Sequence, residues 1–221
     1  MDKDKKIFVL GQYGRMGRRY TAILKWLGHA VDGWDVTEVG KSHTPNIGRL
    51  CPSLRNYTHV IIATPTDIHA DLMTQCCQSG VPYVLCEKPM CMDYRRAKQL
   101  AEVVSHSQTD VRVVCNWAYV REGVVLTARS HRIRYSNWYT GPHSDDWNLI
   151  QIHYLDKTGR AMVSLGPRFE CRIDGSDVTL ADIDNSYIRM LSTWLSSPHQ
   201  LWGMEDVMAQ ELLISKMGEA R

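Results

Sequence analysis

The chain has 221 residues, of which 44% are hydrophobic and 23% charged, as in a globular protein with one large domain or two small ones. The net charge of +2 gives no reason to expect nucleic acid or an anionic membrane as partner, and no apolar run is long enough to span a membrane. The first residues lack a signal-peptide pattern and the seven cysteines lack metal-binding spacing, so we expect reduced thiols, no metal and a cytoplasmic protein.

Strands and helices alternate over the first 120 residues. Short apolar runs predict strands at residues 6–10, 29–35, 59–63, 81–87 and 111–120. Apolar residues at helical spacing predict helices at residues 18–28, 67–80 and 92–107, with polar loops and at most one short helix over residues 36–57. Because several strands are continuous apolar runs, the pattern predicts a doubly wound parallel sheet covered on both faces.

The pattern changes after Arg121, where we place a domain boundary. Residues 1–121 would form a dinucleotide-binding Rossmann domain, and residues 122–221 a small α+β domain with an antiparallel sheet. Its expected strands lie at residues 124–139, 160–166, 168–175 and 178–183, and its expected helices at residues 144–159, 187–197 and 204–220. The basic run in residues 129–134 fits a solvated sheet face best, with an acidic substrate or RNA as alternatives.

Three glycines stand between the first strand and the first helix: Gly11, Gly14 and Gly17. Glycine permits a tight turn, lets the backbone approach a pyrophosphate and lets the helix pack close to the strand, while the helix N-terminus offers free N–H groups to the phosphates. Asp35 ends the second strand and could accept hydrogen bonds from an adenosine ribose, which favours NAD over NADP. The alternative is a plain glycine turn and a solvated aspartate.

Two proline-containing turns, residues 64–66 (TPT) and 87–89 (EKP), follow neighbouring strands. In parallel sheets, ligands collect at the carboxyl ends of the strands, so both turns should lie beside the glycine turn. Lys88 would then project toward the cofactor and substrate as a hydrogen-bonding cation. A surface lysine after a strand is the alternative.

Residues 63–89 closely resemble a signature of the Gfo/Idh/MocA oxidoreductases, with A-T-P-x-x-x-H followed by a helix, a glycine and E-K-P. The matching residues are Ala63, Thr64, Pro65, His69, Gly80, Val84, Glu87, Lys88 and Pro89. The resemblance implies an NAD(P)-dependent enzyme that oxidises or reduces a hydroxyl of a sugar, cyclitol or similar small molecule. The residues expected to contact the cofactor are Gly11, Tyr13, Gly14, Arg15, Met16, Asp35, Ala63, Thr64, Pro65, His69, Glu87 and Lys88.

The resemblance weakens in the second half. Residues 147–156 (WNLIQIHYLD) are similar to a family motif whose histidine transfers the proton, which assigns catalysis to His153 together with Lys88. The same resemblance implies a substrate pocket that includes Lys88, Asn116, Tyr119, Arg121 and His153.

Leu149 occupies the place of the family's inner aspartate, and only about 100 residues follow Arg121. A non-catalytic dinucleotide-binding sensor or partner subunit is therefore the alternative function. In the family the second-domain sheet often forms a dimer interface, so a homo-oligomer is an open expectation.

Overall fold

The computed structural model describes residues 5–35, 54–91, 93–114, 116–120, 130–136, 149–154, 164–165, 171–173, 176–177 and 179–208. At residues 117 and 118 and from 130 to 177, it describes the backbone alone. The chain divides into two compact units: residues 1–114 together with 191–221, and residues 115–190. The predicted functional division after residue 121 stays a prediction.

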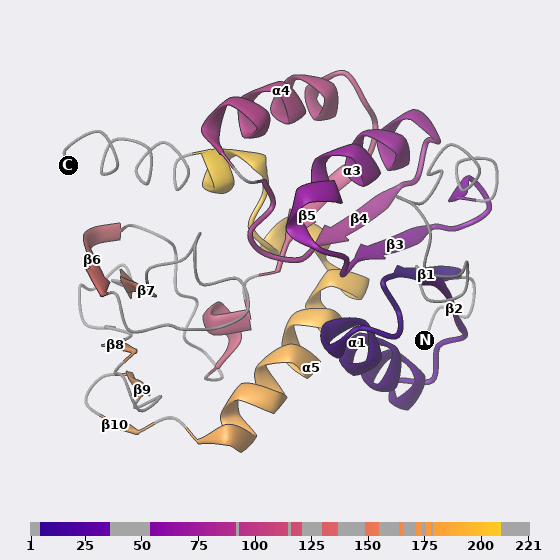
Figure 1. The fold of residues 1–221 in the computed structure, drawn as a ribbon. Coiled ribbons are helices and arrows are strands. Elements are labelled where there is room, and N and C mark those ends of the chain that lie inside the picture. Colours follow the sequence, from indigo (N-terminus) through magenta and orange to yellow (C-terminus); the bar gives the residue numbers. More distant parts are fainter. Residues whose placement is uncertain are drawn as a thin grey trace. The chain divides into compact units, whose positions relative to one another are not determined.

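Five short parallel strands form the sheet of the first unit (Figure 1). The strands are β1 (Ile7–Leu10), β2 (Val31–Trp34), β3 (His59–Ile62), β4 (Tyr83–Cys86) and β5 (Asp110–Val113). They lie in the order β2-β1-β3-β4-β5, and every neighbouring pair is parallel. The predicted Rossmann-type parallel sheet is confirmed.

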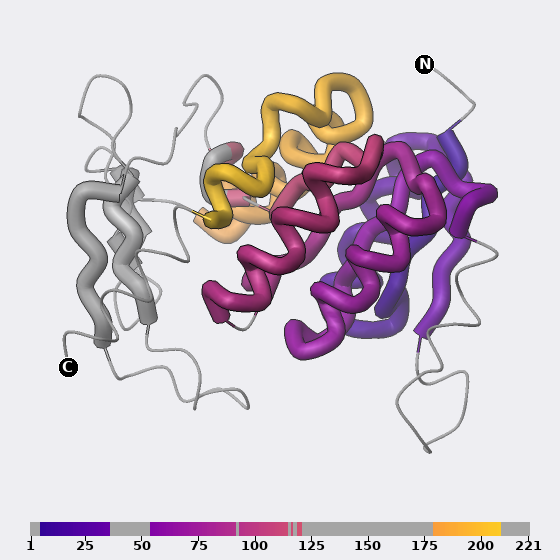
Figure 2. The backbone as a smooth tube through the Cα atoms, turned by 90° about the horizontal axis from the view of Figure 1, so that it is seen from above, coloured from indigo at the N-terminus to yellow at the C-terminus, as the bar shows by residue number. Residues whose placement is uncertain are grey.

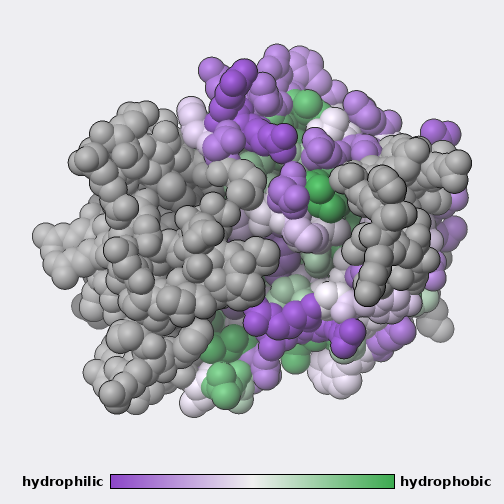
Figure 3. Space-filling view, viewed as in Figure 1, coloured by the Kyte–Doolittle hydropathy of each residue, from purple (hydrophilic) through white to green (hydrophobic). Residues whose placement is uncertain are grey.

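Helices connect these strands and cover the sheet. The helices are α1 (Arg15–Trp26), α3 (His69–Gln78), which follows a 3-10 turn at Thr66–Ile68, and α4 (Tyr94–Ser105). Figures 1 and 2 show α3 and α4 side by side on one face of the sheet, while α1 lies on the other face. Asp93 caps α4 by accepting a hydrogen bond from the Arg96 N–H at 2.8 Å. Hydrophilic residues cover most of the visible outer surface of α4 (Figure 3).

Both faces of the three central strands, β1, β3 and β4, are buried, which is why these strands are almost continuously apolar. Alternate strand residues, including Phe8, Leu10, Val60 and Ile62, belong to the core cluster that also contains residues of α3 and α4. The residues between them in the strands are equally buried but lie outside that cluster: Ile7, Val9, Ile61 and Leu85. Since side chains alternate along a strand, this second set faces the layer that contains α1.

The chain returns to this sheet in the last turns of α5 (Leu180–Ser196). Trp194, fully buried, packs edge-on against the His59 ring with centroids 5.0 Å apart. After a 3-10 turn at Pro198–Gln200, the Trp202 carbonyl accepts a hydrogen bond from the Val113 N–H at 3.0 Å. Residues 204–208 are helical, and the rest of the helix predicted at residues 204–220 lies outside the described residues.

The second unit contains a 3-10 turn and short antiparallel strands. The turn spans Asn116–Tyr119, so the strand predicted at residues 111–120 ends earlier, at Val113. The strands are β6 (Ser130–Ser136), which pairs with β7 (Leu149–Tyr154), and β8 (Ser164–Leu165), β9 (Cys171–Ile173) and β10 (Ser176–Asp177), which pair in the order β10-β9-β8. A complete antiparallel domain over residues 122–221 stays a prediction.

Two predicted elements are wrong. The helix predicted at residues 144–159 is replaced by β7, whose sequence alternates Ile150, Ile152 and Tyr154 with polar residues at the period of a strand. Leu149 and His153 of the resembling motif therefore lie on a strand and not on a helix.

The strand predicted at residues 178–183 is also wrong, because α5 begins there. Thr179 and Asp182 form a capping box: the Asp182 carboxylate accepts from the Thr179 N–H at 2.8 Å, and Thr179 Oγ1 accepts from the Asp182 N–H at 3.1 Å. This reciprocal pair satisfies N–H groups at the start of the helix.

Candidate functional site

The carboxyl ends of four strands form one row, which brings the predicted turns together. Leu10 pairs in register with Trp34 on one side and Ile62 on the other, and Ile62 pairs with Cys86. The next residues along the four strands are Asp35, Gly11, Ala63 and Glu87, in the order β2-β1-β3-β4. With neighbouring strands about 4.8 Å apart, this row is about 14 Å wide.

The glycine turn requires glycine for steric reasons. Gly11 has φ +83°, and a Cβ there would lie 2.5 Å from the Ala63 carbonyl oxygen on the neighbouring strand. At Gly17 a Cβ would lie 2.0 Å from the Gly11 carbonyl oxygen, so this glycine lets α1 pack against the turn. Gly14 is exposed, and a Cβ there would meet no atom closer than 3.3 Å. The turn therefore has no room for a side chain at Gly11 and Gly17, its two ends, but has room for one at Gly14 in the middle.

The start of α1 has the character of an anion site. Gly14 is its N-cap, no side chain in the described part of the chain caps it, and its first turn contains no acidic residue. The first N–H groups of a helix have no partner within the helix and carry a partial positive charge. Arg15 is exposed at this position and adds a full positive charge. These groups together suit a phosphate.

Asp35 closes one end of the row. Its side chain is 6% exposed, and Oδ2 accepts a hydrogen bond from the Tyr13 N–H at 2.9 Å. The carboxylate is thus fastened to the glycine turn itself. A carboxylate at this place can accept hydrogen bonds from ribose hydroxyls and repels a 2′-phosphate.

The TPT turn lies between the glycine turn and the EKP turn. Thr64 Oγ1 is buried and has no hydrogen-bond partner among the described residues. A buried hydroxyl in this state is costly unless a ligand or water pairs with it. Pro65 is exposed and begins the turn that leads into α3.

His69 lies beneath these turns rather than at their surface. It is 1% exposed, with Nε2 2.8 Å from the Thr64 carbonyl oxygen and Nδ1 2.9 Å from the Pro89 carbonyl oxygen. A neutral imidazole has one N–H and donates to one of the two carbonyls, whereas an imidazolium donates to both. The ring thus joins the TPT turn to the EKP turn.

The EKP turn ends the row opposite Asp35. Lys88 is exposed, whereas Glu87 on one side is 8% exposed and Met90 is 1% exposed. The Lys88–Pro89 peptide is cis. Glu87 Oε2 accepts from the Lys88 N–H at 2.9 Å, and Glu87 Oε1 accepts from the Tyr20 hydroxyl of α1. The sequence assigned Tyr20 only to the apolar face of a helix, and no local signal indicates a partner 67 residues away.

Four buried cysteines lie in α3, at the end of β4 and after the EKP turn. They are Cys76, Cys77, Cys86 and Cys91. Burial raises the pKa of the Cys86 thiol well above its usual value, and the Glu87 carboxylate raises it further. A thiol in this environment stays protonated and packs as a small hydrophobe.

The predicted substrate residues divide into three groups. Asn116 is 2% exposed, its Nδ2 donates to Ser186 Oγ at 3.4 Å, and its Oδ1 has no partner among the described residues. Tyr119 is half-buried, and its carbonyl accepts from Arg189 Nε at 2.7 Å, a contact that sequence reasoning missed. Arg121 lies outside the described residues, and His153 is described by its backbone only, in β7.

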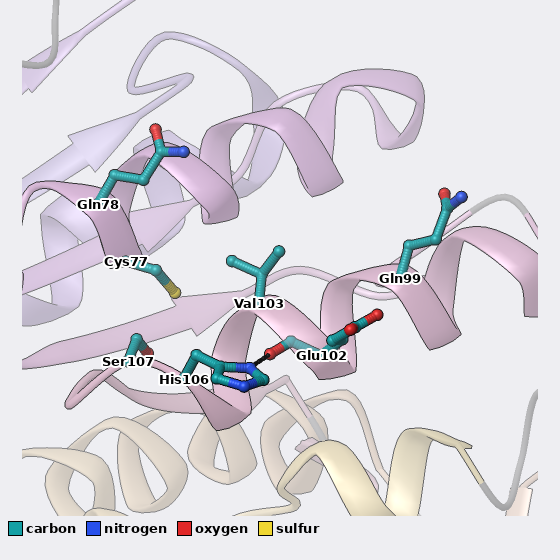
Figure 4. Close-up of a pocket in the computed structure, with 7 residues that line it drawn as sticks. All are labelled: Cys77, Gln78, Gln99, Glu102, Val103, His106 and Ser107. Atoms are coloured by element: carbon teal, nitrogen blue, oxygen red, sulfur yellow. Dashed lines mark hydrogen bonds between the residues drawn. The ribbon is translucent and has the colours of Figure 1, made fainter.

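A groove in the described part of the chain lies away from this row (Figure 4). It is an open groove of about 490 Å³ between the ends of α3 and α4, lined by Cys77, Gln78, Gln99, Glu102, Val103, His106 and Ser107. Since α3 ends just before β4 starts, the groove lies toward the amino ends of the strands, the opposite edge from the turns. Its side chains do not converge on a common point, and His106 is bonded to the Glu102 carbonyl of its own helix.

Two further classes of site have no support in the described residues. None of the described helices combines the length and apolar character that a membrane crossing requires. No group of three or more His, Cys, Asp and Glu side chains among these residues is arranged to hold a metal ion.

The chain matches one protein family. Residues 5–115 match the Gfo/Idh/MocA group, described as an oxidoreductase family with an NAD-binding Rossmann fold. No functionally curated protein matches the chain.

Solved structures of oxidoreductases resemble the chain at low identity. An oxidoreductase from Sinorhizobium meliloti is 16% identical, with 54% of this chain and 39% of that chain covered and a TM-score of 0.45. A putative myo-inositol dehydrogenase from the same species is 24% identical, with 52% and 37% covered and a TM-score of 0.42. The chain thus spans about two fifths of the length of these proteins.

The WlbA (WbpB) dehydrogenase from Thermus thermophilus, solved with NAD and UDP-GlcNAcA, is 10% identical. The match covers 92% of this chain and 91% of the WlbA chain, with a TM-score of 0.57. At this identity the likeness is one of fold alone.

Proposed function

This chain belongs to the Gfo/Idh/MocA oxidoreductase family, and we propose that it transfers a hydride between NAD and a secondary alcohol or ketone. The substrate class proposed is a sugar, a cyclitol or a related small molecule. The observation that carries the proposal is the position of Asp35, Gly11, Thr64 and Lys88. They follow the ends of four neighbouring strands, along the carboxyl edge of a parallel sheet. Ligands bind at this edge in open α/β sheets.

The residues of this row fit a dinucleotide. The glycine turn and the uncapped start of α1 would hold the pyrophosphate, and the Asp35 carboxylate would accept from a ribose hydroxyl. Thr64 Oγ1, which pairs with no group among the described residues, offers a donor and an acceptor between the two ends of the row. The bound cofactor would supply the hydride chemistry at its nicotinamide ring. We propose NAD as the preferred cofactor, because Asp35 disfavours the 2′-phosphate of NADP.

Lys88 would orient the substrate. It is exposed in the EKP turn, whose residues Glu87 and Pro89 are held by buried contacts, and its ammonium can donate up to three hydrogen bonds. A cation beside the reacting hydroxyl stabilises the negative charge that develops on oxygen during hydride transfer. By family resemblance, His153 would take the proton, with Asn116, Tyr119 and Arg121 around the substrate.

A non-catalytic role is the second candidate. Leu149 stands where the family has an aspartate. A leucine cannot orient an imidazole or raise its basicity. Under this reading the chain binds NAD as a sensor or partner subunit without turnover.

Calorimetric titration of the folded chain with NADH and NADPH tests the cofactor. Absence of uptake of either dinucleotide would overturn both candidates. A substrate panel of polyols, cyclitols, ketoses and nucleotide sugars, including UDP-GlcNAcA, then tests turnover by NADH absorbance. Binding without turnover of any panel member would favour the sensor.

The Lys88→Ala variant tests the assigned residue if turnover is found. We expect it to lose turnover by at least about a hundredfold, because the cation acts on the reacting oxygen, while NADH affinity stays within about threefold. The Lys98→Ala variant, at an exposed position of α4, is the matched control for loss of a surface lysine. Equal turnover in the two variants would remove Lys88 from the reaction.

A further inference from the structure

Glu87 is a buried carboxylate whose bonds serve position rather than stability. It is 8% exposed, and its two oxygens accept from two different donors, the Tyr20 hydroxyl and the Lys88 N–H. A buried carboxylate is costly unless it is fully paired, and replacement of a whole buried polar pair by apolar side chains of similar size is often neutral for stability. A pair of this kind therefore points to a requirement for a defined geometry at the residue that follows, Lys88.

Tyr20 connects this carboxylate to the helix that begins at the glycine turn. Its side chain is fully buried, and it lies five residues after Arg15, about 7.5 Å along the axis of α1. The uncapped start of the same helix is the place proposed for the cofactor phosphates. One rigid helix thus has the phosphate site at its end and the Glu87 contact about one and a half turns further on.

The other side of Lys88 is fixed independently. The Pro89 carbonyl lies 2.9 Å from His69 Nδ1, and the same ring contacts the Thr64 carbonyl through Nε2. His69 belongs to α3, whereas Tyr20 belongs to α1, so the two anchors come from different helices. With Pro89 held, a change in the place of Glu87 must turn the backbone at Lys88.

We propose that Tyr20 is a positioning residue that couples dinucleotide binding at the glycine turn to the placement of the Lys88 side chain. The inference rests on the proposed function, because it requires a dinucleotide at the start of α1. Phosphate binding holds α1 in place, the Tyr20 hydroxyl holds Glu87, and the Glu87 carboxylate holds the Lys88 N–H. Without the hydroxyl, the carboxylate keeps one donor of two and is free to turn toward water.

The test measures how Lys88 responds to NADH. The rate at which acetic anhydride acetylates Lys88 is followed by peptide mass spectrometry, with and without saturating NADH, relative to the exposed Lys98. In the wild-type chain we expect NADH to change the Lys88 rate at least about fivefold, a coupling of ordinary size. In Tyr20→Phe we expect NADH still to bind within about threefold of wild-type affinity, with the change in Lys88 rate reduced to less than about twofold.

The Tyr57→Phe variant is the matched control. The Tyr57 hydroxyl also donates to a carboxylate, Asp32 Oδ2 at 2.9 Å, but at an exposed place. In Tyr57→Phe, NADH should change the acetylation rate of Lys88 as much as in the wild type, because no part of this contact reaches the EKP turn. A purely structural role for Tyr20 would lower the melting temperature without altering the response of Lys88.

Each outcome decides between the claims. A wild-type chain that binds no NADH overturns the proposed function and the coupling together. If NADH binds and Lys88 responds equally in the wild type and in Tyr20→Phe, the coupling alone is wrong. Should circular dichroism show that Tyr20→Phe does not fold, Glu87→Gln replaces it, since a carboxamide has one acceptor oxygen for two donors. That nearly isosteric variant must show the same loss of response, and a full response overturns the coupling.

Discussion

Replacing His59 with phenylalanine should remove most of the loss of stability that mild acid causes. The imidazole of His59 is 3% exposed, stacked on Tyr83 at 4.8 Å and packed edge-on against Trp194 at 5.0 Å. Burial, together with smaller effects of the Lys5 and His29 charges, lowers the pKa of His59 from 6.5 to about 4. In the unfolded chain the ring returns to its ordinary pKa, so acid protonates the unfolded chain first.

The size of the effect follows from the two pKa values. Because the folded pKa is the lower one, stability is complete above about pH 6.5 and declines as the pH falls toward 4. At about 1.4 kcal/mol for each pH unit between the two values, the full loss is about 3 kcal/mol. Of this, about 2 kcal/mol falls between about pH 7.5 and about pH 5.

Urea denaturation at these two pH values measures the difference. The His59→Phe variant keeps an aromatic ring between Tyr83 and Trp194 but cannot bind a proton, so its free energy of unfolding should fall by about 2 kcal/mol less than that of the wild type. The loss of the 2.8 Å contact between Thr58 Oγ1 and the imidazole applies equally at both pH values and cancels. The exposed His199, changed to glutamine, controls for removal of a histidine as such. Equal losses in the wild type and His59→Phe would refute the reasoning.

Three further substitutions test the site and its support. Gly11→Ala should weaken NADH binding at least about tenfold in calorimetric titration, because φ is +83° and a Cβ would lie 2.5 Å from the Ala63 carbonyl oxygen. The control is Gly28→Ala, at φ +87° with open space around it, which should bind NADH normally. Asp35→Asn should raise NADPH affinity relative to NADH by about tenfold, since it keeps an oxygen for the Tyr13 N–H and removes the charge, and an unchanged ratio would contradict this. Arg112→Ala should lower the free energy of unfolding by about 1–2 kcal/mol, because the Arg112 side chain pairs with Asp110 and donates to the Leu201 carbonyl at 3.0 Å. A urea denaturation curve that matches the wild type would show that neither contact stabilises the chain.

Local patterns in the first half sufficed to predict its fold. Between residues 6 and 35, each step from strand to glycine turn to helix to strand depends on residues close in sequence, and the structure has β1, α1 and β2 there. The position of the three turns at one edge of the sheet also followed from the parallel arrangement. By contrast, the contact of Tyr20 with Glu87 joins residues 67 positions apart, and no periodicity indicates it.

The second half shows why periodicity alone misleads. Residues 149–154 contain apolar side chains that satisfy both a helical and an alternating pattern, and the alternating one, rich in β-branched residues, corresponds to β7. For residues 178–183, the apolar content suggested a strand, although Thr179 and Asp182 already had the spacing of a capping box. That signal was available in the sequence and outweighs the apolar content.

The return of the chain after α5 has a practical consequence for fragment expression. Trp194 covers His59, and the residue pair Val113 and Trp202 closes the edge of the sheet at β5. A truncated gene that stops after residue 121 would leave that edge and the Trp194 binding face open to water and to other chains. A soluble cofactor-binding half must therefore carry the last thirty or so residues with it, as a two-segment graft or a circular permutant rather than a simple N-terminal piece.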